Sequence, residues 1–240
     1  MKVIIHRAKS RGHVNRNRLK VFHTFSYGEY FNPERVHFGT LRVLNDYIVA
    51  PGQGFGTRSR HNMEMIFIPL QGEIEHQDNL DNKQVIGRGA IQIMSAGIGI
   101  SHSEYNKNLD KPLHFLLIWI LPERQDAEPR YQAAQIADLM VQNQLTEIAK
   151  PYPGDGQGVW IGQQAWVSAG RLDRDIEVTY RLKSAESYGV YLFVLSGEVI
   201  IDNDIELLPR DGMGITQADE FRIRALTDAE VLLIEVPALK

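Results

Sequence analysis

Short apolar runs, rich in β-branched and aromatic residues, recur along the whole chain between Gly, Asn, Asp and Pro residues. Such runs, when turn-forming residues bound them, are typical of β-strands. The clearest are LRVLNDYIVA, MEMIFIPL, AIQIM, LHFLLIWIL, YGVYLFVL and EVLLIEVP. The pattern therefore predicts an all-β fold.

One segment departs from this pattern. Residues 130–150 carry helix-forming side chains at helical spacing, and the turn-forming run 151–156 follows them. We expect a helix over 130–150 that ends in a flexible connection. We place the link between two domains at residues 126–150, with one domain over 1–125 and the other over 151–240.

An internal repeat indicates that the two domains are of the same kind. The sequence LQGEI at 70–74 returns as LSGEV at 195–199, each time directly after an apolar run. The likeness extends downstream, where QVIGRGAIQIM follows the first copy and ELLPRDGMGIT follows the second. Repeats of this kind favour duplication. We therefore predict two small β-barrels packed together, with Gly72 and Gly197 at equivalent tight turns.

Side chains that can carry chemistry are concentrated in the first half. All eight histidines lie between His6 and His114, so any imidazole site belongs to the first domain. A glycine-rich loop leads into a predicted strand, in which residues two apart share a face. One face then carries Arg58, Arg60, Asn62, Glu64, Ile66 and Ile68, and His61 points the other way. His102 and Glu104 share a face of a later strand, and neighbouring strands would bring the two sets into one interior.

Several phrases of this sequence, in this order, resemble the pirin family. They are RGH (11–13), FHTFSYGEYFNPE (22–34), LRVLNDYIVAPGQGFG (41–56), EHQD (75–78), GAIQIMSAGIGISHSEYN (89–106) and LIWILPE (117–123). The resemblance implies two tandem cupin barrels, that is, double-stranded β-helices of the jelly-roll type. It also implies Fe(II) or a similar divalent ion, held in the first barrel by three histidines and a glutamate. Some members cleave flavonols such as quercetin with dioxygen, and others regulate transcription or metabolism through partners.

The four ligand positions of the family fall on Arg58, Arg60, His102 and Glu104. A guanidinium has no free acceptor lone pair and stays protonated, so arginine cannot replace a neutral imidazole as a metal ligand. The remaining pair should have lost most of its affinity for Fe(II). For His61 to serve as a metal ligand instead, the strand would have to slip by one residue, which would turn all of its side chains to the opposite face.

The first interpretation is a pirin-like protein without a metal cofactor, acting as a sensor, a regulator or a binder of small anions. Two guanidiniums would replace the charge of the metal, and Glu104, together with Glu64, would pair with Arg58 and Arg60. The alternative is a flavonol dioxygenase with Fe(II) on His102, Glu104 and a rearranged His61. Glu104 would then be the catalytic residue that accepts the substrate proton. A structural scaffold for protein partners is the third interpretation.

Composition excludes some classes of binding partner and of cellular location. A formal net charge of -4, with both signs interspersed, gives no footprint for direct binding to nucleic acid. The longest apolar run, residues 115–121, is too short to span a membrane, and His6 and Arg7 break the N-terminal run too early for a signal peptide. The chain has no cysteine. We expect a cytoplasmic protein whose partners are a small aromatic or anionic ligand and another protein.

Overall fold

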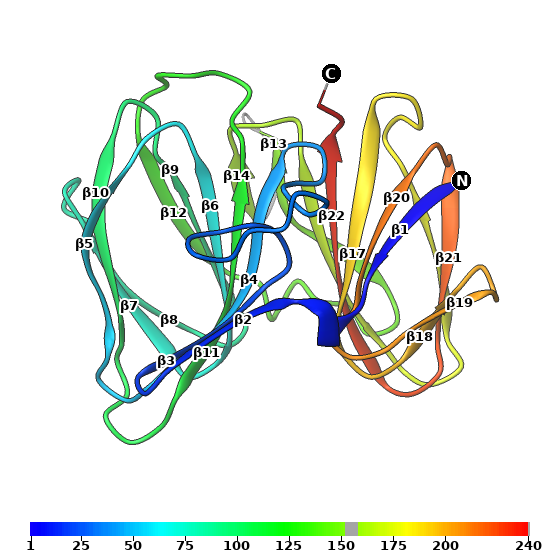
Figure 1. Cartoon of the computed structure of the whole chain (residues 1–240), viewed down its shortest axis with the longest axis horizontal. Helices are drawn as coiled ribbons and strands as arrows, with labels where there is room; N and C mark the ends of the chain where they lie inside the picture. Colours follow the sequence, from blue (N-terminus) through cyan, green and yellow to red (C-terminus); the bar gives the residue numbers. More distant parts are fainter. Residues whose placement is uncertain (152–157, 240) are drawn as a thin grey trace.

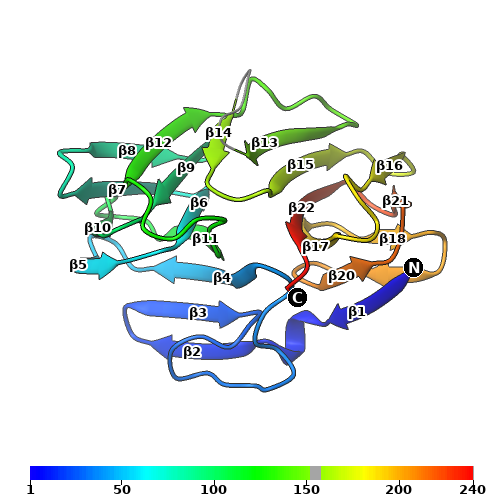
Figure 2. The ribbon, with the colours of Figure 1, turned by 90° about the horizontal axis from the view of Figure 1, so that it is seen from above.

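The computed structural model describes residues 1–151 and 158–239, which fold into two β-barrels lying side by side (Figures 1 and 2). Each barrel combines a seven-stranded sheet with a four-stranded sheet. Apart from one 3-10 helix, η1 (Ala8–Ser10), the regular structure in these ranges is entirely β. The described residues contain no apolar helix of membrane-spanning length. The all-β prediction is confirmed.

The first barrel is built around the apolar runs of the first half of the chain. Its larger sheet has the order β12 (Arg130–Gln135), β9 (Ala90–Ser95), β6 (Glu64–Gln71), β11 (Leu113–Ile120), β4 (Leu41–Val49), β3 (Leu19–His23) and β2 (Gly12–Arg16). Its smaller sheet has the order β5 (Gly54–Arg60), β10 (Ile100–Asn106), β7 (Glu73–Asp78) and β8 (Lys83–Gly87).

The second barrel repeats this plan. Its larger sheet has the order β1 (Lys2–His6), β20 (Gly212–Thr216), β17 (Tyr188–Ser196), β22 (Ala229–Pro237), β15 (Trp166–Leu172), β13 (Leu145–Pro151) and β14 (Val159–Ile161). Its smaller sheet has the order β16 (Glu177–Arg181), β21 (Glu220–Ala225), β18 (Val199–Ile201) and β19 (Ile205–Leu207). Strand for strand, β6 corresponds to β17, β11 to β22 and β10 to β21.

The repeated LQGE and LSGE sequences occupy the same place in both barrels. Gly72, with φ 77°, turns the chain from β6 into β7, and Gly197, with φ 72°, turns it from β17 into β18. Glycine suits these positive φ values because it has no Cβ. Just before each glycine, the pairing with the neighbouring strand skips one residue, Leu70 in β6 and Leu195 in β17. The prediction of equivalent turns is confirmed.

One strand of each large sheet comes from outside its own repeat. β1 precedes the first barrel in sequence but pairs with β20 of the second, and β12 precedes the second barrel but pairs with β9 of the first. Both exchanged strands lie at the edge of their sheets (Figure 2). The barrels are therefore tied together by chain connectivity as well as by packing.

The helix predicted over 130–150 is wrong. This segment holds β12, a pair of turns and β13, so the stretch assigned as a linker supplies strands to both barrels. Pairing of β12 with β9 and of β13 with β15 outweighs the weak helical preference of its Ala, Gln and Leu residues. Of the connection predicted at 151–156, only Pro151 lies within the described residues, where it ends β13.

Alternate residues of the central strands serve two different cores. Met65 and Phe67 of β6 belong to the core inside the first barrel. Ile66 and Ile68 face the opposite way and join a cluster with Tyr191 and other residues of the second barrel. A sheet that is buried on both faces needs apolar residues on both, which explains the uninterrupted apolar runs. The contact between the barrels is thus itself a hydrophobic core.

Candidate functional site in the first barrel

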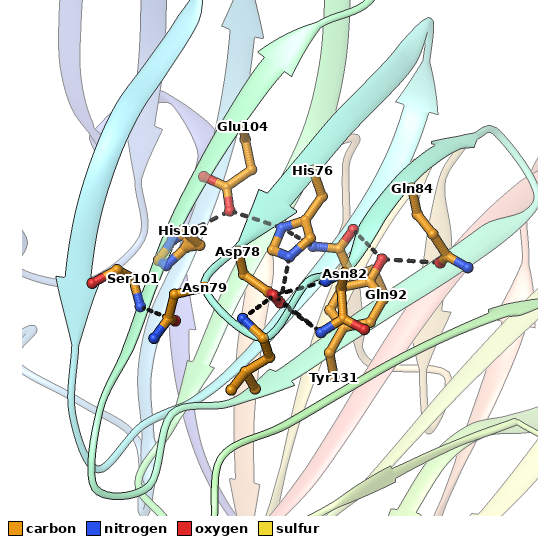
Figure 3. Close-up of polar contacts among 11 residues, drawn as sticks. His76, Asp78, Asn79, Asn82, Gln84, Gln92, Ser101, His102, Glu104 and Tyr131 are labelled. Atoms are coloured by element: carbon orange, nitrogen blue, oxygen red, sulfur yellow. Dashed lines mark hydrogen bonds and ion pairs between the residues drawn. The ribbon is translucent and has the colours of Figure 1, made fainter.

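The candidate site lies on the inner face of the small sheet, where β10 runs between β5 and β7. His102 is opposite Arg58 on one side, and Glu104 is opposite His76 on the other. Ile100, two residues before His102 on β10, belongs to the barrel core. Period-2 alternation therefore directs His102 and Glu104 into the same interior. Figure 3 shows the polar side chains around His76 and Glu104, to which the large sheet contributes Gln92 of β9 and Tyr131 of β12.

Arg58 makes the shortest ion pair of the site. Its Nη2 donates a hydrogen bond to Glu104 Oε2 at 2.6 Å. The Glu104 side chain is 2% exposed, whereas that of Arg58 is 31% exposed. The Arg58 guanidinium also lies over the Phe55 ring, 4.5 Å from its centroid. The buried carboxylate is therefore neutralised by an arginine that still reaches the surface.

Arg60 lies on the same strand and is held differently. Its guanidinium stands over the Trp119 ring at 5.2 Å, and Nη1 donates to the carbonyl of Ser59 at 2.9 Å. Among the described residues no carboxylate forms an ion pair with it. The Nε atoms of Arg58 and Arg60 are both buried without a hydrogen-bond partner in the described part of the chain. Two guanidinium groups with unused N–H donors thus stand side by side on β5.

His102 is neutral in this setting. Burial lowers the pKa of its imidazole to about 4, because the nearby Glu104 only partly offsets the loss of solvent and the cations of Arg58 and Arg60 oppose protonation. Its Nε2 lies 3.2 Å from Glu104 Oε1. Its Nδ1 and Glu104 Oε1 are buried without a hydrogen-bond partner among the described residues.

His76 belongs to the same cluster, although sequence analysis did not place it there. It is fully buried, with Nδ1 3.6 Å from Glu104 Oε1 and Nε2 3.0 Å from Asp78 Oδ2 (Figure 3). Gln92 Nε2 lies 3.2 Å from Nδ1, and the Tyr131 ring stacks on the imidazole at 4.6 Å. His76 thus donates through Nε2 and accepts at Nδ1. The sequence held a signal for this, because His76 and Asp78 repeat the two-residue spacing of His102 and Glu104.

Glu64 and His61 lie outside this cluster. The shared face predicted for Arg58, Arg60 and Glu64 is wrong, because the chain leaves β5 at Arg60 and turns at Asn62, whose φ is 47°. Glu64 begins β6 and accepts hydrogen bonds from Ser95 Oγ at 2.7 Å and from the backbone N–H of Gly162 at 2.9 Å. Burial raises the pKa of this carboxyl.

His61 is exposed and packs against Gly99. No hydrogen bond or ion pair between described residues joins it to His102 or Glu104. A rearranged site that uses His61 would therefore require the chain between β5 and β6 to move.

The donor set does not fit a transition metal. Of the four residues at which the resemblance to pirins places the metal ligands, Arg58 and Arg60 carry no lone pair, and Glu104 already accepts a hydrogen bond from Arg58. His76 could not take their place, since its Nδ1 is occupied by Gln92 and its Nε2 by Asp78. Within the described residues no three His, Asp or Glu side chains are arranged to hold a metal ion.

Two repeated barrels, with a histidine and carboxylate cluster inside the first of them, define a bicupin protein. Comparison with known families agrees, since residues 5–120 match the pirin family and residues 148–236 match the quercetinase C-terminal cupin domain. The chain belongs to the pirin family.

Relatives at moderate identity extend along the whole chain. The protein named quercetin 2,3-dioxygenase from Escherichia coli K12 is 36% identical over 235 residues, which cover 98% of this chain and 99% of the relative. The crystal structure of the bacterial pirin YhhW from Escherichia coli, in complex with nickel(II), is 35% identical and has a TM-score of 0.92 over 99% of this chain and 100% of that one. YhaK from Escherichia coli is 28% identical, with a TM-score of 0.73 over 89% of this chain and 92% of that one.

Proposed function

We propose that the first barrel of this pirin-family protein binds small anions at Arg58 and Arg60, and that the protein acts through this binding as a sensor or regulator. The observation that carries the proposal is the hydrogen bond from Arg58 to the buried Glu104. A guanidinium takes over the neutralising role that a metal ion has at this position in the family. Metal-dependent cleavage of flavonols is therefore not the leading function.

Charge supports an anion as the ligand. The neutral His102 adds no charge, and one carboxylate, Glu104, faces the two guanidiniums. The other nearby carboxylate, Asp78, accepts hydrogen bonds from His76, Asn82 and the backbone of Leu80, and among the described residues it forms no ion pair with Arg58 or Arg60. One positive charge thus remains for a ligand at the partly exposed heads of Arg58 and Arg60. Guanidinium forks match carboxylates, phosphates and phenolates.

The aromatic rings beneath the arginines favour a flat ligand. Phe55 lies under Arg58, and Trp119 lies under Arg60. Rings held in place by cation–π contacts present further apolar surface beside the cationic heads. An aromatic carboxylate or phenolate fits this combination better than inorganic phosphate.

Binding of benzoate, followed by calorimetry, tests the proposal directly. We expect the variant carrying Arg58→Gln and Arg60→Gln to bind benzoate about tenfold more weakly than the unmodified protein, because two charge-assisted hydrogen bonds are lost. Arg16→Gln is the matched control, since Arg16 forms an exposed ion pair with Glu29. Equal affinity of all three proteins would refute the anion site.

Flavonol cleavage is the second candidate, and the name of the Escherichia coli relative and the nickel(II) in YhhW favour it. Metal analysis of protein purified without chelators separates the two functions. We expect well under one equivalent of iron, nickel and zinc. We also expect the double variant Arg58→His and Arg60→His to gain metal affinity strongly, because two imidazole ligands are restored. Stoichiometric metal held by His102 and Glu104 in the unmodified protein would refute the metal-free site and favour the second candidate.

A further inference from the structure

A cavity lies where the two barrels meet, outside the site in the first barrel. Its volume is about 280 Å³, and residues of both barrels line it. The floor is apolar and includes Ile148 and Leu232, which are 1% exposed. Leu70 and Leu195, the two equivalent residues that the strand pairing skips, both line it. Corresponding parts of the duplicated halves therefore line the cavity.

Arginines gather at one part of its wall. Arg88 Nη2 lies 3.2 Å from Glu230 Oε1, and Arg171 Nε lies 3.6 Å from the same oxygen. The side chains of Arg88 and Arg171 are 65% and 40% exposed. Glu230 is the one acidic residue among the described residues that line the cavity. A single carboxylate oxygen cannot neutralise two guanidiniums, so one positive charge is left over.

Arg210 adds a cation on the second barrel's side. Its Nη1 lies 3.5 Å from Asp46 Oδ1 and is buried without a hydrogen bond among the described residues. Asp46 is already shared, because Arg11 donates to it at 2.8 Å and His114 at 2.7 Å. Burial alone would raise the pKa of Asp46, but these neighbours hold it at about 2. Asp46 therefore carries a single negative charge at neutral pH. Three guanidiniums therefore line the cavity, whereas Glu230 supplies the one carboxylate among the described residues that line it.

The turn that presents Arg210 is unusual for an arginine. Its φ is 68°, in the left-handed region that favours glycine, and Gly89 has φ 88° in the corresponding turn of the first barrel. A non-glycine residue in this region is uncommon, and such positions gather at ligand sites. Arginine therefore occupies a position beside the cavity whose positive φ favours glycine. The positive excess is also local, because the whole chain has a formal net charge of -4.

We propose that the cavity between the barrels binds a small amphipathic carboxylate, with its head at Arg88, Arg171 and Arg210 and its apolar body on the floor. A volume of about 280 Å³ holds about nine water molecules, so the body must be short, about eight to ten non-hydrogen atoms in all. An apolar floor with a few convergent charged groups is the usual composition of a small-molecule site. This site is independent of the one at Arg58 and Arg60.

Octanoate and its neutral analogue octanamide are the probes that test this site by calorimetry. We expect octanoate to bind at least about tenfold more tightly than octanamide, and to bind more weakly as salt concentration rises. The variant carrying Arg88→Gln and Arg171→Gln should lose about fivefold in affinity for octanoate and keep its affinity for octanamide. Both arginines are exposed enough for this variant to fold, which thermal unfolding verifies.

Two further variants fix the location. Ala137 lines the cavity from an exposed position, so Ala137→Trp should fill the cavity and abolish binding of both probes. Arg16→Gln should leave octanoate binding unchanged, since Arg16 does not line the cavity and forms only an exposed ion pair with Glu29. Equal affinity for octanoate and octanamide, no effect of Arg88→Gln with Arg171→Gln, no effect of Ala137→Trp, or no binding at about 10 mM octanoate would each overturn the proposal.

Discussion

Replacing Arg58 and Glu104 with glutamine, singly and together, tests the central contact of the first barrel. Two unit charges with centres about 4 Å apart attract by about 4 kcal/mol at an effective dielectric of 20. The Arg58 side chain is 31% exposed, so solvent screens part of this attraction. A coupling free energy of about 2 kcal/mol remains after that discount.

The two single variants should not be equally destabilised. Arg58→Gln leaves the Glu104 carboxylate, 2% exposed, without its cation, and we expect a loss of about 3 kcal/mol in the free energy of unfolding. Glu104→Gln leaves an arginine that can turn toward water, so the loss should be about 1 kcal/mol. The double variant should lose about 2 kcal/mol, which is less than the two single losses together.

Urea unfolding followed by circular dichroism at pH 7 measures these free energies. The cluster shared by both barrels should make the chain unfold in one transition, which allows a single free energy to be assigned. The matched control is the cycle of Arg16 and Glu29, whose side chains are 66% and 78% exposed and should couple weakly. A coupling between Arg58 and Glu104 as weak as this control, with equal losses from both single variants, would refute the charge-replacement argument.

Three more predictions concern stability. Burial lowers the pKa of His6 to about 4, so the folded protein binds fewer protons at this residue than the unfolded chain does below pH 6.5. The free energy of unfolding should therefore fall as the pH drops from 6.5 toward 4. Urea unfolding at several pH values should show a flatter slope for His6→Gln. Ala at Gly197 would meet the Asp228 carbonyl oxygen at positive φ, whereas Ala at Gly72 approaches the Pro112 carbonyl less closely. Gly197→Ala should therefore lower the free energy of unfolding more than Gly72→Ala, each by at least about 1 kcal/mol, as urea unfolding measures. Removing residues 1–7 should destabilise the second barrel by about 3 kcal/mol or more, because β20 loses one of its two neighbouring strands and Tyr191 loses the hydrogen bond with His6. Hydrogen exchange should then show reduced protection at 212–216. A flat pH profile, equal effects of the two glycine variants, and unchanged protection of β20 would contradict these predictions in turn.

The repeat at Gly72 and Gly197 allowed the two-barrel fold to be predicted, because a duplicated turn is a local feature that one sequence displays. The helix predicted over 130–150 failed because partners far away in sequence decide its structure. Arg130 pairs with Ser95, and Leu145 pairs with Gly170. Helical propensity is a weak preference that strand pairing easily reverses.

The candidate site was partly predictable for a similar reason. Alternation gives the face of a side chain but not the neighbour of its strand. His102 and Glu104 were assigned to one face, whereas His76 was missed because its pairing with Glu104 is a matter of register between β7 and β10. Glu64 was misplaced because the strand was assumed to continue through Asn62, a residue type that readily adopts the left-handed conformation found there.

The exchanged strands β1 and β12 affect the order in which the molecule can assemble. Lys2 and Thr216, which face each other across β1 and β20, are 214 positions apart in the chain. During translation β1 is therefore made long before its partner, and the first barrel stays incomplete at β9 until residues 130–135 have been made. Contacts of such long sequence separation slow folding, so the edge of β9 and the free strand β1 are the surfaces that a nascent chain exposes longest.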